Sequence, residues 1–247
     1  MNPSHELIGE SPYQSIPYLP CSRLGKGEHY SSSAKYFTEE LRHPAERIYI
    51  TEKVDGSSVA AVRAEGNQFI AVNKFGHPVS TSHWACYNGF DQWVTDHRLV
   101  LLEILPNVGD RLCGEWLYQV HGIKYDRLPD LFLAFDIKYR SDKTCQYIST
   151  KRFSEIIDQF AFVCRVPIIY FGPPIDPKWL SILTRQSHFR LKGGRMEGCV
   201  LRRERDGYRI DIAKYTRPDH KAGIFLPETE NAVVDEPVWN DVWGGEK

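Results

Sequence analysis

The stretch Thr51-Glu52-Lys53-Val54-Asp55-Gly56-Ser57-Ser58 places a lysine at the end of an apolar β-strand, which we predict over residues 47–54. Partial desolvation at the end of a strand favours the neutral, nucleophilic form of an amine. Gly56 permits a tight turn, so the lysine can face a ligand at close range. The string Lys-x-Asp-Gly alone also suits an ordinary β-turn between surface charges. Its meaning therefore depends on the charged residues further along the chain.

Four largely apolar segments on the C-terminal side of this stretch each place a charged residue inside or at the end of a predicted strand. These residues are Glu115, Asp136, Glu197 and Lys214, the first three inside predicted strands and the last at the end of the final strand. An unpaired charge in an apolar strand is costly, so each needs a partner or a function. Any one of them could be a structural ion pair or an edge-strand charge. Four in this order behind Lys-x-Asp-Gly are hard to explain by chance.

With these motifs the chain resembles the covalent nucleotidyltransferases, the superfamily of ATP-dependent ligases and capping enzymes, whose motifs I, III, IIIa, IV and V occur in this order. In detail it is similar to the RNA ligase family, the phage-type nick-sealing RNA ligases and their relatives. The similarity extends from about residue 14 to about residue 220. The further segments that carry it are Ile16-Pro17-Tyr18-Leu19-Pro20, Ser22-Arg23-Leu24-Gly25, Gly114-Glu115-Trp116-Leu117-Tyr118, His121-Gly122-Ile123, Tyr125-Asp126-Arg127-Leu128-Pro129 and Phe135-Asp136-Ile137.

The resemblance implies a three-step reaction. Lys53 would attack the α-phosphorus of ATP and expel pyrophosphate, leaving a lysyl-AMP phosphoramidate. AMP would pass to the 5′-phosphate of a nucleic acid, and a 3′-hydroxyl would then attack this end and release AMP. Lys214 would contact the α-phosphate, and Glu197 would help to hold Mg²⁺ (or Mn²⁺), because hard cations prefer carboxylates.

The resemblance also implies a set of nucleotide-binding residues. Glu115 would bind the ribose hydroxyls, Phe135 would stack on adenine, and Glu52 would read the adenine amino group. Asp55 and Gly56 would shape the turn behind the nucleophile.

Three positions differ from the family pattern. Ser58 stands where many RNA ligases have asparagine, and a hydroxyl is a weaker contact for a metal-bound water. Lys74 replaces an arginine that approaches the phosphates, which keeps the charge but loses the bidentate fork. Motif V often has two lysines, so the second cation beside Lys214 is either missing or supplied by Arg217.

The expected fold class is α+β, a nucleotidyltransferase (ATP-grasp-like ligase adenylation) domain with two mainly antiparallel sheets, flanking helices and the ATP site between the sheets. The expected organisation is a loop-rich N-terminal segment over 1–45 that packs on an adenylyltransferase domain over 46–221, then an acidic tail over 222–247. We expect no OB-fold after motif V, because only about 30 residues follow Lys214. This weakens two alternatives, a DNA ligase and a capping guanylyltransferase. The intact charged residues argue against a third, a non-catalytic nucleotide- or RNA-binding relative.

The periodicity of the sequence predicts individual elements. We expect helices over 33–41, 84–105, 150–162 (capped by Ser149) and 178–186 (after Pro177), strands over 58–63, 68–73, 111–118 and 131–138, and a final hairpin of 196–203 with 208–214.

Charge is balanced overall but uneven along the chain. The 247 residues include 31 Lys and Arg against 32 Asp and Glu, which argues against a protein that coats nucleic acid. Residues 185–221 nevertheless carry 11 basic against 5 acidic residues, and residues 222–247 carry one Lys against 6 acidic residues. The basic segment surrounds Glu197 and Lys214, where phosphates are expected to arrive.

Cysteine and histidine spacing indicates neither zinc nor a disulfide framework. The six cysteines form no CxxC pair and are expected to be free thiols in a reducing cytoplasm. Most histidines, His188 and His220 among them, are expected at the surface or in local hydrogen bonds, with His121 set apart because it lies in a family-like segment. No run suits a membrane span. The expected partner is RNA with 3′-hydroxyl and 5′-phosphate ends, with a nicked duplex, an RNA/DNA hybrid and a repair-complex partner left open, and the protein is expected to be a cytoplasmic monomer.

Overall fold

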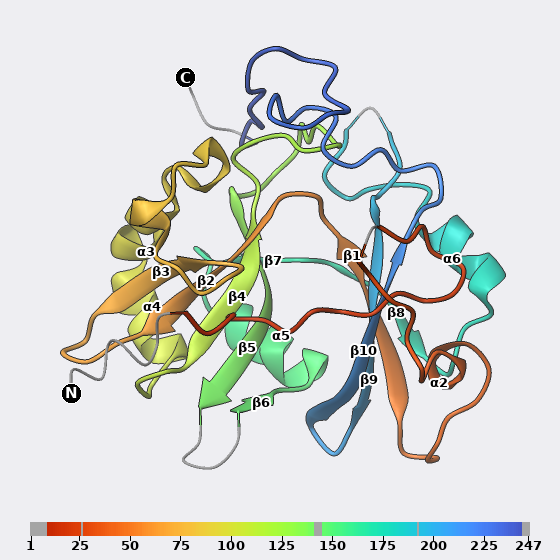
Figure 1. Cartoon of the computed structure of the whole chain (residues 1–247). Helices are drawn as coiled ribbons and strands as arrows, with labels where there is room; N and C mark the ends of the chain where they lie inside the picture. The colour runs from red at the N-terminus through yellow and green to blue at the C-terminus, as the bar shows by residue number, and fades with distance from the viewer. Residues whose placement is uncertain (1–8, 26, 141–144, 192, 244–247) are drawn as a thin grey trace. The chain divides into compact units, whose positions relative to one another are not determined.

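The computed structural model describes residues 9–25, 27–140, 145–191 and 193–243, which fold into two compact units (Figure 1). Unit 1 comprises Met1–Gln14, Gly56–Gln119 and Pro129–Arg165, and unit 2 comprises Ser15–Asp55, Val120–Leu128 and Val166–Lys247. The chain passes from unit 2 to unit 1 between Asp55 and Gly56, inside the lysine-bearing stretch. Parts of the expected N-terminal segment (1–8 and 26) and acidic tail (244–247) lie outside the described residues.

Unit 1 is built on a six-stranded sheet. Five strands lie in the order β3-β2-β4-β5-β6 and are antiparallel, while β7 pairs with β5 in parallel. Their bounds are β2 Ser57–Arg63, β3 Phe69–Asn73, β4 Arg111–Trp116, β5 Phe132–Arg140, β6 Cys145–Tyr147 and β7 Cys164–Arg165.

Both faces of this sheet are apolar, because successive apolar side chains of its strands point to opposite faces. Val59 and Ala61 of β2 pack in one core cluster with the helices α3 (Phe90–Asp96), α4 (Arg98–Ile104) and α5 (Thr150–Ile157). Ala60 and Val62 face the other way, into a second cluster that Tyr13 helps to cover. Because successive side chains of a strand point to opposite faces, a sheet covered on both sides needs apolar residues at every position.

The helical part of unit 1 is more broken than the sequence predicts. The single helix predicted over 84–105 is instead a 3-10 turn, Ala85–Tyr87, followed by α3 and α4; another 3-10 turn covers Val79–Thr81. Gly89, with a φ of 82°, begins α3, and His97 separates α3 from α4. The predicted cap of α5 is confirmed, because the Ser149 side chain accepts a hydrogen bond from the Arg152 backbone N–H, but α5 stops at Ile157.

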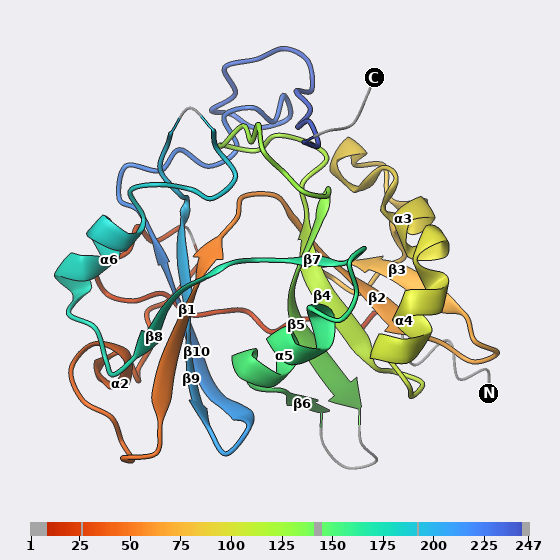
Figure 2. The same ribbon diagram turned by 180° about the vertical axis from the view of Figure 1, so that it is seen from behind.

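Unit 2 is built on a four-stranded antiparallel sheet in the order β10-β9-β1-β8. The strands are β1 Arg47–Lys53, β8 Ile168–Gly172, β9 Gly198–Arg205 and β10 Tyr208–Thr216, and the helices are α2 Lys35–Thr38 and α6 Pro177–Leu183. The helices contribute Phe37 and Leu180 to a core with Ile50 and Leu201 of the sheet. Figure 2 shows α2 and α6 beside this sheet. The final hairpin is present, but β9 begins and ends two residues later than predicted and β10 ends two residues later. β8 was not predicted.

The expected fold class is confirmed: the protein is α+β, with two mainly antiparallel sheets, few helices and no OB-fold in the described part of the chain. Among the described residues, no helix combines the length and apolar character needed to cross a membrane.

Candidate active site

Lys53 forms an ion pair with Glu197. Lys53 ends β1 and pairs in register with Gly198, so the residue before Gly198 reaches the end of β1. The Lys53 Nζ and Glu197 Oε2 atoms are 2.6 Å apart, and the side chains are 24% and 9% exposed. Glu197 was predicted inside a strand but lies one residue before β9, where its side chain turns towards the lysine rather than into the sheet.

Gly198 makes this arrangement possible. A Cβ atom at this position would lie 1.8 Å from the Tyr215 carbonyl oxygen of β10, so only glycine fits between these strands. The close approach of β9 and β10 fixes the position of Glu197 just before the start of β9.

Lys214 provides a second cation on the same face of this sheet. Ala213 and Tyr215, its neighbours on β10, point into the core, so Lys214 points to the opposite face. Lys53 points to that opposite face as well, because it lies three residues after the core residue Ile50 on β1. Burial lowers the pKa of Lys214, and the nearby positive charge of Lys53 lowers it further. The carboxylate of Glu28 works against both, because its Oε1 atom lies 3.3 Å from the Lys214 Nζ.

An N-terminal segment holds the surroundings of Lys214 in place. The backbone N–H of Lys214 donates to the Pro17 carbonyl at 2.9 Å, and the Leu19 N–H donates to the Lys214 carbonyl at 2.9 Å. Between these bonds, the Tyr18 ring centroid lies 3.9 Å from the Lys214 Nζ, and the Tyr18 hydroxyl donates to Glu28 at 2.7 Å. Burial, and then the bond to Glu28, raise the pKa of Tyr18. The sequence offered no signal for Glu28, and Tyr18 stood out only as part of the N-terminal signature.

Asp55, Glu197 and His220 form a compact group of potential metal ligands. One ligand atom from each lies within 4.8 Å of the others, and all three residues are buried. The Gly122 backbone N–H donates to Asp55 Oδ2 at 2.8 Å, and the Asp55 N–H donates to the Tyr125 hydroxyl at 2.8 Å. Asp55 was expected only to shape the turn, and His220 was expected at the surface or in local hydrogen bonds. Here the structure corrects the prediction, because His220 is 3% exposed and, among the described residues, its buried Nε2 has no hydrogen-bond partner.

The three side chains fit a divalent cation. Two carboxylates supply the oxygen ligands that Mg²⁺ and Mn²⁺ prefer, and an imidazole nitrogen is a ligand for Mn²⁺ but is disfavoured by Mg²⁺. Burial lowers the pKa of His220, with the charges of Lys53 and Arg217 acting in the same direction and Glu197 against them. In the part of the chain that the structure describes, the buried His220 Nε2 has no hydrogen-bond partner.

Glu52 points away from Lys53, towards the core side of the sheet, because it is the preceding residue on β1. Its carboxylate accepts hydrogen bonds from the Ser187 hydroxyl at 2.5 Å, the His188 backbone N–H at 3.0 Å and the His188 Nδ1 at 2.9 Å. The bond to Glu52 raises the pKa of His188. To bind the adenine amino group, Glu52 would therefore have to replace at least one of these hydrogen bonds with a bond to adenine.

The other predicted nucleotide-binding residues lie in unit 1. The Gly56 N–H donates to Glu115 Oε1 at 3.2 Å, and Ser58 faces Glu115 across the β2–β4 pair. A Cβ atom on Gly56 would lie 2.7 Å from the Trp116 carbonyl oxygen, so this glycine allows the start of β2 to approach β4.

Phe135 and Lys74 are further apart along the same sheet. Phe135 lies on β5 and contacts Tyr13 edge-on, with ring centroids 4.9 Å apart. Lys74 follows β3, is exposed, and holds its Nζ 5.0 Å from the centroid of the neighbouring Phe75 ring. The predicted residues thus form two groups: Lys53, Glu197, Asp55 and Lys214, with Glu52 behind them, in unit 2, and Gly56, Ser58, Lys74, Glu115 and Phe135 in unit 1.

Arg217, the predicted substitute for a second motif V lysine, lies just beyond β10. Its guanidinium donates to the Met196 carbonyl and pairs with Asp219 at 2.7 Å, and its backbone N–H donates to the Glu197 carbonyl at 3.0 Å. These bonds tie it to the segment that carries Glu197.

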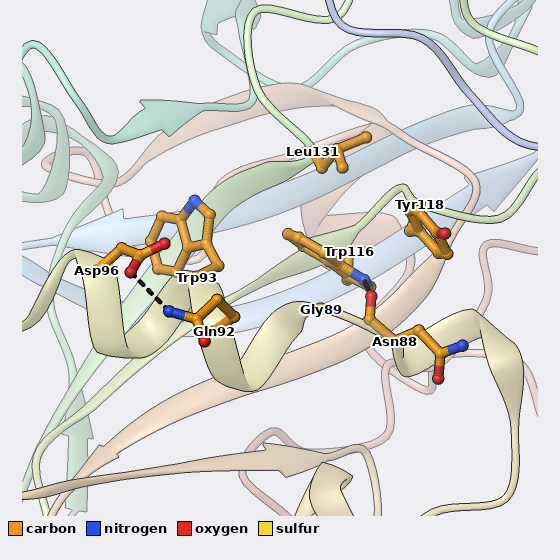
Figure 3. Close-up of a pocket in the computed structure, with 8 residues that line it drawn as sticks. All are labelled: Asn88, Gly89, Gln92, Trp93, Asp96, Trp116, Tyr118 and Leu131. Atoms are coloured by element: carbon orange, nitrogen blue, oxygen red, sulfur yellow. Dashed lines mark hydrogen bonds between the residues drawn. The ribbon is translucent and has the colours of Figure 1, made fainter.

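Unit 1 also contains an open pocket of about 350 Å³ (Figure 3). It is lined by Asn88, Gly89, Gln92, Trp93, Asp96, Trp116, Tyr118 and Leu131. The Trp116 indole N–H donates to the Asn88 carbonyl at 3.0 Å, and Gln92 donates to Asp96 at 2.7 Å. None of the predicted site residues lines this pocket.

Comparisons with known proteins identify the family of this chain. The family model for RNA ligases matches residues 46–216, well over half of the chain, so the chain belongs to the RNA ligase family. A search among curated proteins gave no match.

Solved structures of an RNA ligase from Naegleria gruberi share the fold. The structure with pyrophosphate has a TM-score of 0.54 at 19% identity and covers 85% of this chain and 59% of that one. A lysine-to-methionine mutant with AMP and Mn has a TM-score of 0.53 at 17% identity, with coverage of 85% and 60%. A lysine-to-alanine mutant with ATP and Mn has a TM-score of 0.53 at 16% identity, with the same coverage. The present chain therefore spans about three fifths of the length of these ligases.

Proposed function

We propose that this chain is an ATP-dependent RNA ligase that joins 3′-hydroxyl and 5′-phosphate ends through a lysyl-AMP intermediate and an adenylated 5′ end. The observation that carries the proposal is the Lys53–Glu197 ion pair with Lys214 on the same sheet face, in a chain of the RNA ligase family. The Naegleria structures with ATP, AMP, Mn and pyrophosphate support the choice of nucleotide and metal.

In this proposal Lys53 is the nucleophile of the first step. Its Nζ forms a bond to the α-phosphorus of ATP while the bond to pyrophosphate breaks, and the proton of the ammonium must leave before the attack. Glu197, 2.6 Å away, is placed to hold the amine in position and to accept that proton. The nitrogen–phosphorus bond then breaks as AMP passes to an RNA 5′-phosphate.

Lys214 stabilises negative charge on the α-phosphate. Phosphoryl transfer depends mainly on positioning and on cationic charge near the phosphate oxygens, and such charge acts most strongly in a desolvated site. The Lys214 side chain is held by Glu28 and Tyr18 and is largely buried, so it is already ordered before the nucleotide arrives.

Asp55 and Glu197 are the residues that would hold Mg²⁺ or Mn²⁺, which supplies further positive charge to the phosphate oxygens when bound. The remaining assignments belong to the same proposal. Glu115 would bind the ribose, Phe135 would stack on the adenine ring, and Glu52 would bind the adenine amino group. Gly56 would shape the turn, Ser58 would contact a metal-bound water, and Lys74 would approach the phosphates.

The organisation of the whole chain is also part of the proposal. Residues 46–221 would form the adenylyltransferase part, with 1–45 and 222–247 as accessory segments. The substrate would be RNA, as a nicked duplex or an RNA/DNA hybrid, bound by a cytoplasmic monomer, alone or with a repair-complex partner.

Labelling with α-³²P-ATP and Mg²⁺, followed by a denaturing gel, tests this function. We expect the wild-type protein to become labelled, and Lys53→Ala and Lys53→Arg to remain unlabelled, since arginine keeps the charge but not the nucleophile. Lys178→Ala is the matched control, because Lys178 is 89% exposed in the same unit.

Labelling from GTP alone would indicate a capping enzyme, and no labelling from either nucleotide would contradict an enzymatic function. Sealing of nicked RNA and DNA duplexes by the labelled protein then separates an RNA ligase from a DNA ligase.

A further inference from the structure

We propose that His220 is a direct nitrogen ligand of the divalent cation held by Asp55 and Glu197, and that it makes this site favour Mn²⁺ over Mg²⁺. The inference rests on the proposed function only in that it concerns the same site. It adds a third ligand, from a loop after β10, to the two carboxylates.

The position of the imidazole carries the inference. His220 is 3% exposed, and its Nε2 lies 3.6 Å from Asp55 Oδ2, too far for a hydrogen bond. Within the described ranges that nitrogen has no hydrogen-bond partner, although a buried polar atom normally has one. A cation bound between the imidazole and the carboxylates would satisfy it.

Hydrogen bonds on both sides hold the backbone of His220 in place. The His220 N–H donates to the Arg217 carbonyl at 3.1 Å, and the Arg23 guanidinium donates to the His220 carbonyl. A Cβ atom on Gly122 would lie 3.0 Å from His220 Cε1 and 2.9 Å from Asp55 Oδ2. Glycine at 122 therefore leaves room for the imidazole and the carboxylate to converge.

The donor set predicts the metal preference. Mg²⁺ keeps an almost entirely oxygen coordination shell, whereas Mn²⁺ and the later divalent metals accept an imidazole nitrogen. A site of two carboxylates and one buried imidazole should lose more affinity for Mn²⁺ than for Mg²⁺ when the imidazole is removed. Lys53 shares Glu197 with this site at 2.6 Å, so its positive charge competes with the cation.

Binding of Mn²⁺ to the full chain, without nucleotide, tests the proposal by electron paramagnetic resonance. We expect ¹⁴N coupling to bound Mn²⁺ in the wild-type protein, and its loss in His220→Ala and His220→Gln. We expect the variants to bind Mn²⁺ about tenfold or more weakly, the range seen when residues around a metal are removed, and Mg²⁺, measured by competition, to change by less than about threefold.

Two matched variants sharpen the result. His188→Asn removes another histidine of unit 2, which is bonded to Glu52, and should keep both the ¹⁴N coupling and the affinity. Lys53→Ala should bind Mn²⁺ at least as tightly as the wild type, because it removes the competing charge.

The wild-type spectrum alone can overturn the inference, even if the His220 variants do not fold. Bound Mn²⁺ without ¹⁴N coupling, coupling that survives in His220→Ala, or no Mn²⁺ binding at all would each contradict it. If the protein is adenylylated but shows no ¹⁴N coupling, His220 is not a ligand and the proposed function stands. If ¹⁴N coupling appears but ATP leaves no label, the metal site stands and the proposed function fails.

Discussion

The environment of Lys53 is formed by residues from distant segments of the chain. Glu197 comes from the start of β9 and Lys214 from β10, while Glu28 and Tyr18 come from the N-terminal segment. The result is a pair of partly buried cations, each held by one carboxylate, on one face of a small sheet. Burying two cations costs desolvation free energy, which the binding of a highly charged ligand can offset. A nucleoside triphosphate is such a ligand.

Replacing Lys214 with alanine should slow adenylylation of the protein by about 10² to 10³-fold, the range typical for loss of one group that stabilises transition-state charge. The reason is the loss of positive charge at the α-phosphate. The rate of adenylylation is measured as label incorporation from α-³²P-ATP under single-turnover conditions. Lys214→Arg is the control, because it keeps the charge; a loss of less than threefold in Lys214→Ala would count against the assigned role.

The His188–Glu52 bond should make stability depend on pH. The bond raises the pKa of His188 above its usual value of 6.5, so its stabilisation is complete below pH 6.5 and declines as the pH rises through the higher value in the folded protein. His188→Asn keeps a donor for Glu52 but does not titrate. Because the His188 side chain is 52% exposed, we expect a difference of at most about 1 kcal/mol.

Urea unfolding of the two proteins from pH 5.5 to 8.5 measures this effect. The free energy of unfolding of the wild type, relative to His188→Asn, should fall as the pH rises. A constant or rising difference would contradict the assigned pairing.

Site residues that belong to a motif could be predicted from the sequence. Site residues that approach the others only in the folded structure could not. Lys53, Glu197 and Lys214 stood out because charged residues end or interrupt apolar strands in a familiar order. Glu28 and His220 carry no such signal, because each lies in a loop and becomes relevant only through its neighbours in space. A contact between residues far apart in the chain leaves no local sequence pattern.

At the scale of elements, the β9–β10 hairpin is the part that fixes the site. Gly198 lies where β9 passes closest to β10, and no side chain fits there. We expect Gly198→Ala to lower the free energy of unfolding by about 1–3 kcal/mol or more, the cost of overpacking, and to reduce adenylylation by displacing Glu197.

Gly207→Asn, in the turn of the same hairpin, provides the control. Gly207 has a φ of 81° and nothing within 4 Å of an added Cβ, and asparagine tolerates that backbone conformation. Urea unfolding with an adenylylation assay should show that Gly207→Asn loses less stability than Gly198→Ala and keeps adenylylation close to the wild-type rate. Equal effects of the two substitutions would argue against a special role for the close approach at Gly198.

Elements with strong local patterns were predicted well, and others were not. The hairpin of β9 and β10 follows from two strand-like segments joined by a turn at Asp206-Gly207, and the capped start of α5 follows from Ser149. The stretch 84–105 is apolar enough for one helix, but tertiary packing divides it at Gly89 and His97. β8 was missed because its five residues are all apolar or glycine, so it shows no alternation; pairing with β1 makes it a strand.

At the scale of the whole molecule, the uneven charge is the feature most relevant to the proposed binding of RNA. The basic segment 185–221 belongs to unit 2 and includes both β9 and β10, so it surrounds Lys53, Glu197 and Lys214. The two-unit organisation itself was not evident from the sequence, because each unit joins segments that are far apart in the chain. Composition alone, with 31 basic and 32 acidic residues, hides this local excess.

RNA binding should therefore be sensitive to salt but modest in strength. If the basic segment neutralises a few phosphates, the affinity for a short nicked RNA duplex should fall at least about tenfold between 50 and 200 mM salt. Lys221→Gln, an exposed residue of the basic segment, should reduce the salt slope by about one, whereas Lys178→Gln outside it should leave the slope unchanged. Fluorescence anisotropy across this salt range measures both. An affinity indifferent to salt would contradict the proposed role of the basic segment.

The most direct test of the central claim is to locate AMP on the protein by mass spectrometry. The full chain is incubated with ATP and Mg²⁺ or Mn²⁺, digested, and its peptides are analysed. We expect one AMP on the peptide that contains Lys53, its removal by added pyrophosphate, and no adduct in Lys53→Arg. AMP attached at another residue, or an adduct that persists in Lys53→Arg, would contradict the assignment of Lys53 as the nucleophile.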